Sequence, residues 1–174
     1  MRAFYALSAA ITLSLAGFAV SGCKKPAEAR ESVFQTVATK EAAPAWKVTD
    51  IDGRPLDSAA FKGKVLVVDF WATWCPPCIA EVPGYVALQK KLGGDGLAIV
   101  GFSLDAGSDV VKTFMAKNGI NYPVAVVDQA MVEAFGNFAG IPTTFVIDRE
   151  GKLRFKKTGG APIEDLERAV KTLL

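Results

Sequence analysis

An apolar run from Val65 to Trp71 sets the strongest limit on how this chain can fold. One carboxylate, Asp69, interrupts the run. A strand with one face in water would alternate apolar and polar residues, so we expect a central strand buried on both faces. Helical periodicity follows from Cys78 to Leu92, and a second apolar run occupies Leu97 to Phe102. Strand, helix and strand in this order predict a βαβ unit with parallel strands.

The rest of the body continues this alternation. An Asp52-Gly53 turn predicts a hairpin at the entrance of the domain. The same kinds of signal predict, in chain order, a helix starting at Ser108-Asp109, a short strand at 124–127, a short helix at 129–135, a hairpin of 143–147 with 152–156, and a final helix opened by Pro162. We therefore expect one α/β domain over residues 45–174, with a central mixed sheet flanked by helices.

Residues 1–22 have the composition of an export signal. Arg2 precedes a long apolar run, and small residues precede Cys23. The segment Val20-Ser21-Gly22-Cys23 resembles a bacterial lipobox, which predicts cleavage before Cys23 and a lipid on its thiol. The alternatives are a plain signal peptide followed by an unrelated cysteine, and an uncleaved membrane anchor of marginal length.

Residues 23–44 are rich in Ala, Lys, Glu and Thr and show no sustained apolar stripe. We expect a flexible, lipid-attached tether that holds the domain off a membrane. Lys24 and Lys25 are too few to bind a membrane by charge, so the lipid is the expected anchor. The expected location is therefore extracytoplasmic on a bacterial membrane, and periplasmic if the cell is Gram-negative.

Histidine is absent, and the charges nearly balance, with 20 Lys and Arg against 18 Asp and Glu. Without histidine there is no imidazole ligand for zinc, copper or haem iron and no Cys–His nucleophile. The net charge of +2 gives no electrostatic reason to expect a nucleic-acid partner. We therefore expect neither a metal site nor a nucleic-acid interface.

Any acid-base chemistry must then come from carboxylates, thiols, Lys, Tyr or water, and the thiols are three cysteines. Cys75 and Cys78 enclose two prolines, whereas Cys23 stands apart. Metal ligation is a weaker interpretation, because a structural zinc site needs four ligands. A purely structural disulfide is also weaker, because closing so short a loop removes little entropy from the unfolded chain. A redox couple fits better, because a helix N-terminus lowers the pKa of a thiol placed there. We expect Cys75 to be the exposed nucleophile and Cys78 the buried resolving thiol, with Trp74 packed beside the pair to limit solvent.

Two separated segments resemble one family. The stretch 68–78, VDFWATWCPPC, and the loop 140–145, GIPTTF, are similar to the active-site and cis-proline segments of TlpA/ResA-like thioredoxin-fold proteins. The resemblance extends over about residues 45–174. It implies a thioredoxin fold with an added N-terminal β-hairpin and an inserted β/α segment near residues 103–136. It also implies a membrane-tethered, extracytoplasmic thiol-disulfide oxidoreductase with no cofactor besides its Cys75–Cys78 disulfide.

The resemblance also implies catalytic roles for two acids. Asp69 would be a buried carboxyl beneath Cys78 that moves a proton through water, and burial would raise its pKa. Glu81 would influence the thiols, because its position three residues along the helix places it on the face of Cys78. The plainer alternatives are a carboxyl satisfied by local hydrogen bonds and a solvated helical charge.

The substrate is expected to meet a second loop. The resemblance implies a cis Ile141-Pro142 bond, with the backbone of Ile141 facing the sulfurs and pairing with an extended substrate chain. The alternative is that Pro142 is an ordinary loop proline. Trp74 and Pro76 complete the expected substrate-binding residues.

The two prolines between the cysteines predict the direction of electron flow. Pro76 and Pro77 have no backbone N–H with which to stabilise a thiolate at Cys75, and such a couple should be more reducing. We therefore expect a monomeric reductase of protein disulfides. The resemblance implies that a membrane electron donor re-reduces it, and that its substrates are proteins such as apocytochrome c or metal-site assembly proteins. The alternatives are a thiol peroxidase, a copper chaperone of the same fold, and a structural lipoprotein with an idle disulfide.

Overall fold

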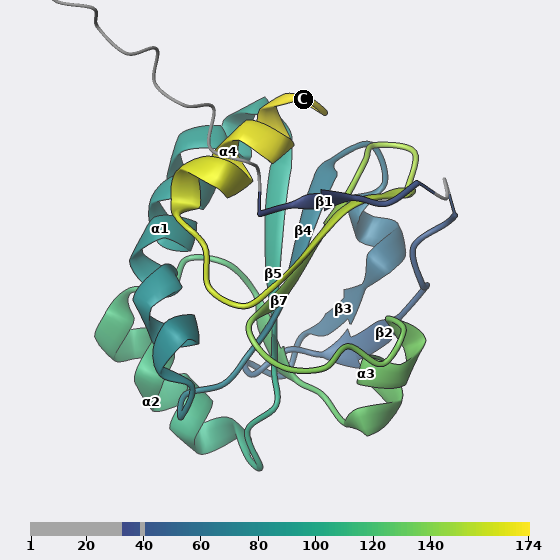
Figure 1. Cartoon of the computed structure of the whole chain (residues 1–174). Helices are drawn as coiled ribbons and strands as arrows, with labels where there is room; N and C mark the ends of the chain where they lie inside the picture. Colours follow the sequence, from purple (N-terminus) through teal and green to yellow (C-terminus); the bar gives the residue numbers. More distant parts are fainter. Residues whose placement is uncertain (1–32, 39–40) are drawn as a thin grey trace, which may run out of the picture. The chain divides into compact units, whose positions relative to one another are not determined.

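The computed structural model describes residues 33–38 and 41–174. The predicted signal peptide and the predicted lipidation site, Cys23, lie outside the described residues. The described part is built on a six-stranded sheet with helices on both faces (Figure 1). The sheet order is β1-β8-β7-β4-β5-β6, with the bounds Gln35–Thr36 (β1), Leu153–Thr158 (β8), Thr143–Ile147 (β7), Val65–Trp71 (β4), Leu97–Ser103 (β5) and Val124–Val126 (β6).

The predicted βαβ unit is confirmed. β4 and β5 pair in parallel, α1 connects them, and every residue of both strands is buried. β6 extends the parallel part, whereas β7, β8 and β1 add antiparallel pairs, so the sheet is mixed, as predicted. The helices are α1 (Pro76–Leu92), α2 (Ser108–Asn118), α3 (Gln129–Ala134) and α4 (Ile163–Lys171).

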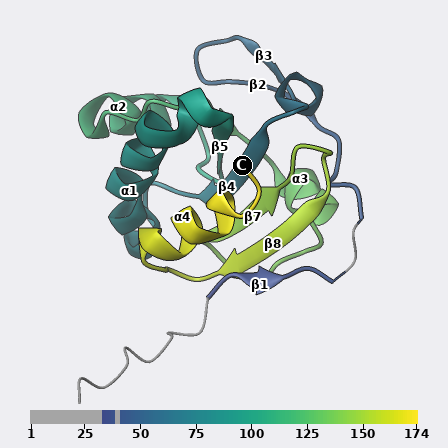
Figure 2. The same cartoon turned by 90° about the horizontal axis from the view of Figure 1, so that it is seen from above.

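Alternation along β4 divides the core in two. Val65 and Val67 belong to a cluster that contains side chains of α1, α2 and α4. Leu66 and Val68 belong to a second cluster, which contains side chains of α3. Figure 2 shows the same division, with α1, α2 and α4 on one side of the sheet and α3 on the other. Asp69 is two residues after Val67 on the same strand, so its side chain lies on the same face of the sheet, which is the α1 side.

The predicted entrance hairpin is present as a separate two-stranded sheet of β2 (Lys47–Thr49) and β3 (Pro55–Asp57). Its turn is held by Asp50, whose carboxylate accepts the backbone N–H groups of Asp52 at 2.9 Å and Arg54 at 2.8 Å. The hairpin lies on the α3 side of the sheet (Figure 2).

The predicted tether over residues 23–44 is wrong for the part that the structure describes. β1 pairs with β8, Phe34 before it is buried, and Ala42 forms a further antiparallel bridge. An open strand edge presents unpaired N–H and C=O groups, and β1 satisfies those of β8. The folded unit therefore begins before Ala45. A strand as short as β1 carries too little periodicity to be recognised from sequence.

Candidate active site

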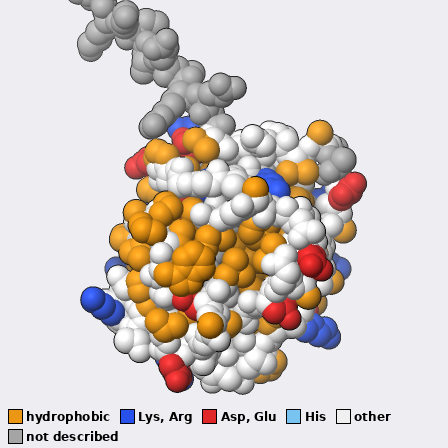
Figure 3. Space-filling model, turned by 60° about the horizontal axis from the view of Figure 1, so that its bottom comes forward, with side chains coloured by type: hydrophobic (Ala, Val, Ile, Leu, Met, Phe, Trp, Pro, Cys, Tyr) orange, Lys and Arg blue, Asp and Glu red, His pale blue; other side chains and the backbone are white. Residues whose placement is uncertain are grey.

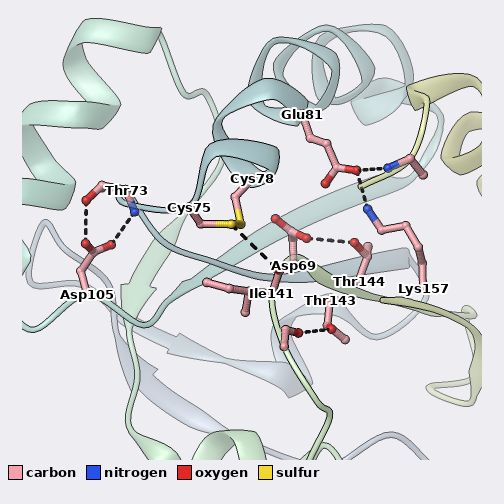
Figure 4. The surroundings of a disulfide bond; sticks show 12 residues. Asp69, Thr73, Cys75, Cys78, Glu81, Asp105, Ile141, Thr143, Thr144 and Lys157 are labelled. Carbon is pink, nitrogen blue, oxygen red and sulfur yellow. Dashed lines mark hydrogen bonds and ion pairs between the residues drawn. A yellow bond between two sulfur atoms is a disulfide. The ribbon is translucent and has the colours of Figure 1, made fainter. Parts of the chain in front are cut away.

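Cys75 and Cys78 form a disulfide at the start of α1, with the sulfurs 2.09 Å and the Cα atoms 5.3 Å apart (Figure 4). Cys75 is the N-cap of α1. Pro76 and Pro77 follow at the first helical positions, where a backbone N–H has no acceptor within the helix. The position predicted for the pair, at the junction of a central strand and a helix, is confirmed.

The loop before β7 packs over the disulfide. Its Ile141-Pro142 bond is cis, as predicted, and the Ile141 carbonyl oxygen lies 3.8 Å from Cys75 Sγ. The Thr143 hydroxyl donates to the Gly140 carbonyl at 2.6 Å and holds the loop in place. Because of this loop the expected exposure of Cys75 is wrong for the oxidised form, in which the residue is only 5% exposed.

The expected packing of Trp74 against the pair is also wrong. Trp74 is 64% exposed and lines a cavity of about 280 Å³ with Leu104, Phe138 and Ile141. Pro76 is exposed as well. Figure 3 shows hydrophobic side chains gathered at the end of the molecule where α1 begins. Trp74 and Pro76 thus leave apolar surface exposed at this end of the molecule.

Asp69 is buried on β4, beside the disulfide (Figure 4). Its Oδ1 accepts the Thr144 hydroxyl at 2.9 Å and the Tyr85 hydroxyl at 3.3 Å. Burial raises the pKa of Asp69 to about 7, against the opposing effect of the positive charge on Lys157. The carboxyl can therefore take up or release a proton near neutral pH, which is the property required of a proton relay for thiols.

Glu81 is not a solvated helical charge. Its Oε1 lies 2.6 Å from Lys157 Nζ and accepts the backbone N–H of Ala161 at 2.7 Å. Its Oε2 is buried and has no hydrogen-bond partner among the described residues. Figure 4 shows Glu81 on α1 above the disulfide, with Lys157 reaching it from β8. The structure thus brings Asp69 and Glu81 to the same side of the sheet, near the cysteines.

Sequence reasoning missed Lys157, Tyr85 and Thr144. One signal for Lys157 was available, because adjacent residues of a strand point to opposite faces and Lys156-Lys157 must place one ammonium on each side. Neither Tyr85 nor Thr144 stands out in sequence, since apolar positions of helices and strands accept such residues routinely.

Asp105 was missed as well. It is buried at the end of β5, and its carboxylate accepts the Thr73 hydroxyl at 2.6 Å, the Thr73 N–H at 2.9 Å and the Ser103 hydroxyl at 2.7 Å. These bonds fix the loop that precedes Cys75 to the carboxyl end of the neighbouring strand. The available signal is an acid two residues after a buried strand, at the sheet edge where sites gather.

Residues 33–38 and 41–174 contain no group of three His, Cys, Asp or Glu side chains placed to hold a metal ion.

A disulfide across the first turn of a helix, at the carboxyl end of a central strand and facing a cis-proline loop, defines a thioredoxin-fold thiol-disulfide oxidoreductase. The profile of the Redoxin family matches residues 38–173, so the chain belongs to the Redoxin family. This match also begins before Ala45, in agreement with the earlier start of the folded unit.

Several known proteins are similar over most of their length. The thiol-disulfide oxidoreductase ResA of Bacillus thuringiensis strain Al Hakam is 33% identical, over 75% of this chain and 76% of its own. The ResA protein of Bacillus subtilis is 31% identical, over 72% of this chain and 70% of its own. The crystal structure of a thioredoxin-family thiol:disulfide interchange protein from Chlorobium tepidum superposes with a TM-score of 0.73 at 37% identity, over 79% of this chain and 98% of that chain. The resemblance predicted from the two motifs is confirmed.

Proposed function

We propose that this protein is an extracytoplasmic, lipid-anchored reductase of protein disulfides. The observation that carries the proposal is the Cys75–Cys78 disulfide at the N-terminus of α1, faced by the Ile141 carbonyl of the cis-proline loop. One sulfur thus lies at a helix end, beside backbone that can pair with an extended chain.

The reaction transfers two electrons from the reduced protein to the substrate. The Cys75 thiolate attacks one sulfur of the substrate disulfide, which forms a Cys75–substrate disulfide and releases the first substrate thiol. Cys78 then attacks Cys75 Sγ, which forms the Cys75–Cys78 disulfide and releases the second substrate thiol. Asp69 takes the proton that the Cys78 thiol loses. The cycle closes when a dithiol donor at the membrane reduces the pair again.

The residues at the start of α1 favour the reducing direction. Pro76 and Pro77 occupy the first helical positions and offer no N–H to a thiolate at Cys75. The thiolate is therefore less stabilised than at a helix start with donors, and the reduced form gives up its electrons more readily.

The substrate side of the proposal rests on the surface around the pair. Exposed Trp74 and Pro76, with the cavity beside Ile141, suit an extended protein segment that carries a disulfide. Apocytochrome c and metal-site assembly proteins are the proposed substrates. A secreted disulfide oxidoreductase of Mycobacterium tuberculosis, 25% identical with a TM-score of 0.65, supports a location outside the cytoplasm. None of the described helices is long and apolar enough to cross a membrane.

Trapping the intermediate tests the proposed chemistry. A Cys78→Ala variant has a free Cys75 thiol. When it is mixed with a protein disulfide, it should accumulate a Cys75–substrate mixed disulfide that mass spectrometry detects. A Cys75→Ala variant, the matched control, should accumulate none, because Cys78 is buried at 2% exposure. Equal trapping by both variants would contradict the assignment of Cys75 as the nucleophile.

The reduction potential tests the direction. Equilibration of the pair with dithiothreitol buffers should give a value near that of thioredoxin, roughly −270 mV. A value near roughly −120 mV, typical of strong oxidants, would show that the protein makes disulfides instead. Peroxide turnover and copper titration of the reduced protein should both be negligible, and either activity would favour one of the alternative functions.

A further inference from the structure

Lys157 is the one buried lysine or arginine among residues 33–38 and 41–174. A buried ammonium is costly unless it is paired, so its partners indicate what it does. Its Nζ lies 2.6 Å from Glu81 Oε1, and 5.8 Å from the centroid of the Phe34 ring. Glu81 on α1 and Phe34, the residue before β1, therefore both lie near the ammonium, and its one ion pair in this part of the chain is with Glu81.

The ion pair lies next to a second acid. Thr144 on β7 pairs with Asp69 on β4 and with Lys157 on β8, so these three residues lie side by side across the sheet. The Thr144 and Tyr85 hydroxyls donate to Asp69 Oδ1, and Glu81, which holds Lys157, faces the same group from α1. Tyr122, which lies before β6, also faces this group, and burial keeps its hydroxyl neutral by raising its pKa. Of these groups only Lys157 is cationic, so two carboxyl groups share one positive charge. A cavity of about 330 Å³ lined by Glu81, Tyr85 and Lys157 opens beside them.

We propose that Lys157 is a positioning residue for the thiol chemistry: its ammonium anchors Glu81 and supplies the positive charge that lets Asp69 ionise beneath the disulfide. With Lys157 in place, Glu81 carries one negative charge that is already balanced. Asp69 can then lose its proton at a cost set mainly by its own burial. Without Lys157, the charge on Glu81 would oppose ionisation of Asp69 directly.

The consequence falls on the second step of the reaction, and to this extent the inference rests on the proposed function. Cys78 must lose its thiol proton to attack Cys75. In the proposed reaction Asp69 accepts this proton, and it can do so only when it is ionised. Lys157 therefore keeps the acceptor available at neutral pH, although it touches neither sulfur nor substrate.

The inference predicts opposite effects for two neutralising changes. The readout is a carbon-13 NMR titration of the Asp69 carboxyl in the full, oxidised protein, in which the sulfurs do not titrate. The signal is identified by its loss in Asp69→Asn. Glu81→Gln removes a negative charge and leaves Lys157 unpaired, so the titration midpoint should fall by about one pH unit. Adding Lys157→Met to this variant removes the cation, so the midpoint should rise again by about one pH unit or more.

The Glu81→Gln/Lys157→Met variant tests the role of Lys157 even if Lys157→Met alone does not fold, because the double variant removes both charges of the buried ion pair. Equal midpoints for Glu81→Gln and Glu81→Gln/Lys157→Met would overturn the inference, since a purely structural lysine would not move the titration. Lys156→Met is the matched control. Lys156 adjoins Lys157 but lies over the Phe145 ring on the other face of the sheet, 5.4 Å from its centroid, and its loss should leave the midpoint unchanged.

The titration does not depend on the direction of catalysis. A wild-type protein that reduces no disulfide would defeat the proposed function, whereas the comparison of midpoints would still decide the role of Lys157. Where reduction is observed, the rate at which Cys78 releases a trapped substrate should follow the same midpoints in each variant. A rate profile that stays fixed while the midpoints move would overturn the link between Lys157 and the thiol chemistry.

Discussion

Asp69 is buried in the central strand, where a carboxyl group favours its protonated form. Its pKa is raised from 3.8 to about 7 in the folded protein. At pH values between these two, the Asp69 carboxyl is ionised in the unfolded chain but protonated in the native protein. The free energy of unfolding therefore falls as the pH rises from about 4 to about 7. A difference of about three pKa units corresponds to about 4 kcal/mol, which is the cost of keeping this acid in the core.

Asp69→Asn should therefore stabilise the protein in a pH-dependent way. The expected gain in the free energy of unfolding is up to about 4 kcal/mol at pH 8 and close to zero at pH 4, because the amide does not ionise. Urea unfolding of the oxidised proteins at both pH values measures it. A gain of the same size at both values would show that the effect is not ionisation.

The exposure of Trp74 could not be predicted from the sequence. An aromatic side chain next to a reactive pair is expected to cover it, because apolar surface favours burial. In the folded protein the pair is covered by the loop of Ile141 instead, and Trp74 projects outward. This arrangement leaves its ring available for a partner, as exposed aromatic residues at interfaces are.

At the scale of elements, β1 shows that residues before Ala45 belong to the fold. Phe34 is buried in the cluster that also contains Tyr85 and Leu166. Its ring also lies near the ammonium of Lys157. The residue that leads into the edge strand β1 therefore packs near the buried ion pair.

Phe34→Ala should lower the free energy of unfolding by about 3 kcal/mol, in the range for aromatic truncation in a core. Val33→Ala is the matched control, because Val33 is 39% exposed and its truncation should change stability by less than about 0.5 kcal/mol. Chemical denaturation of the two variants measures both values. Equal, negligible effects would restore the interpretation of this segment as a tether.

At the scale of the whole molecule, the proposed anchor is separate from the catalytic chemistry. Cys23 lies outside the described residues, and the redox pair is complete without it. We expect Cys23→Ala to abolish labelling with radioactive fatty acid and to move the protein from the membrane to the soluble fraction, because Cys23 is the proposed site of the lipid. The variant should still reduce protein disulfides. A variant that stays in the membrane fraction would indicate an uncleaved N-terminal anchor instead.

The sequence by itself determined the βαβ unit, the mixed sheet, the place of the cysteine pair and the cis-proline loop. These features depend on local patterns: an apolar run, a helical period, prolines at a helix start and a motif of consecutive residues. The burial of Asp69 follows from the same run, since a polar residue inside a buried strand has nowhere else to go.

Only the tertiary structure decided which partners meet around the site. Glu81 and Lys157 are 76 positions apart, and Thr73 and Asp105 are 32 apart, so no local pattern links them. β1 pairs with β8 because that strand has an open edge, which is a property of the assembled sheet. The exposure of Trp74 and the burial of Cys75 depend on where the loop of Ile141 packs. Each of these outcomes arises from contacts between segments that are distant in sequence, where the free energy belongs to the packed pair and not to either segment alone.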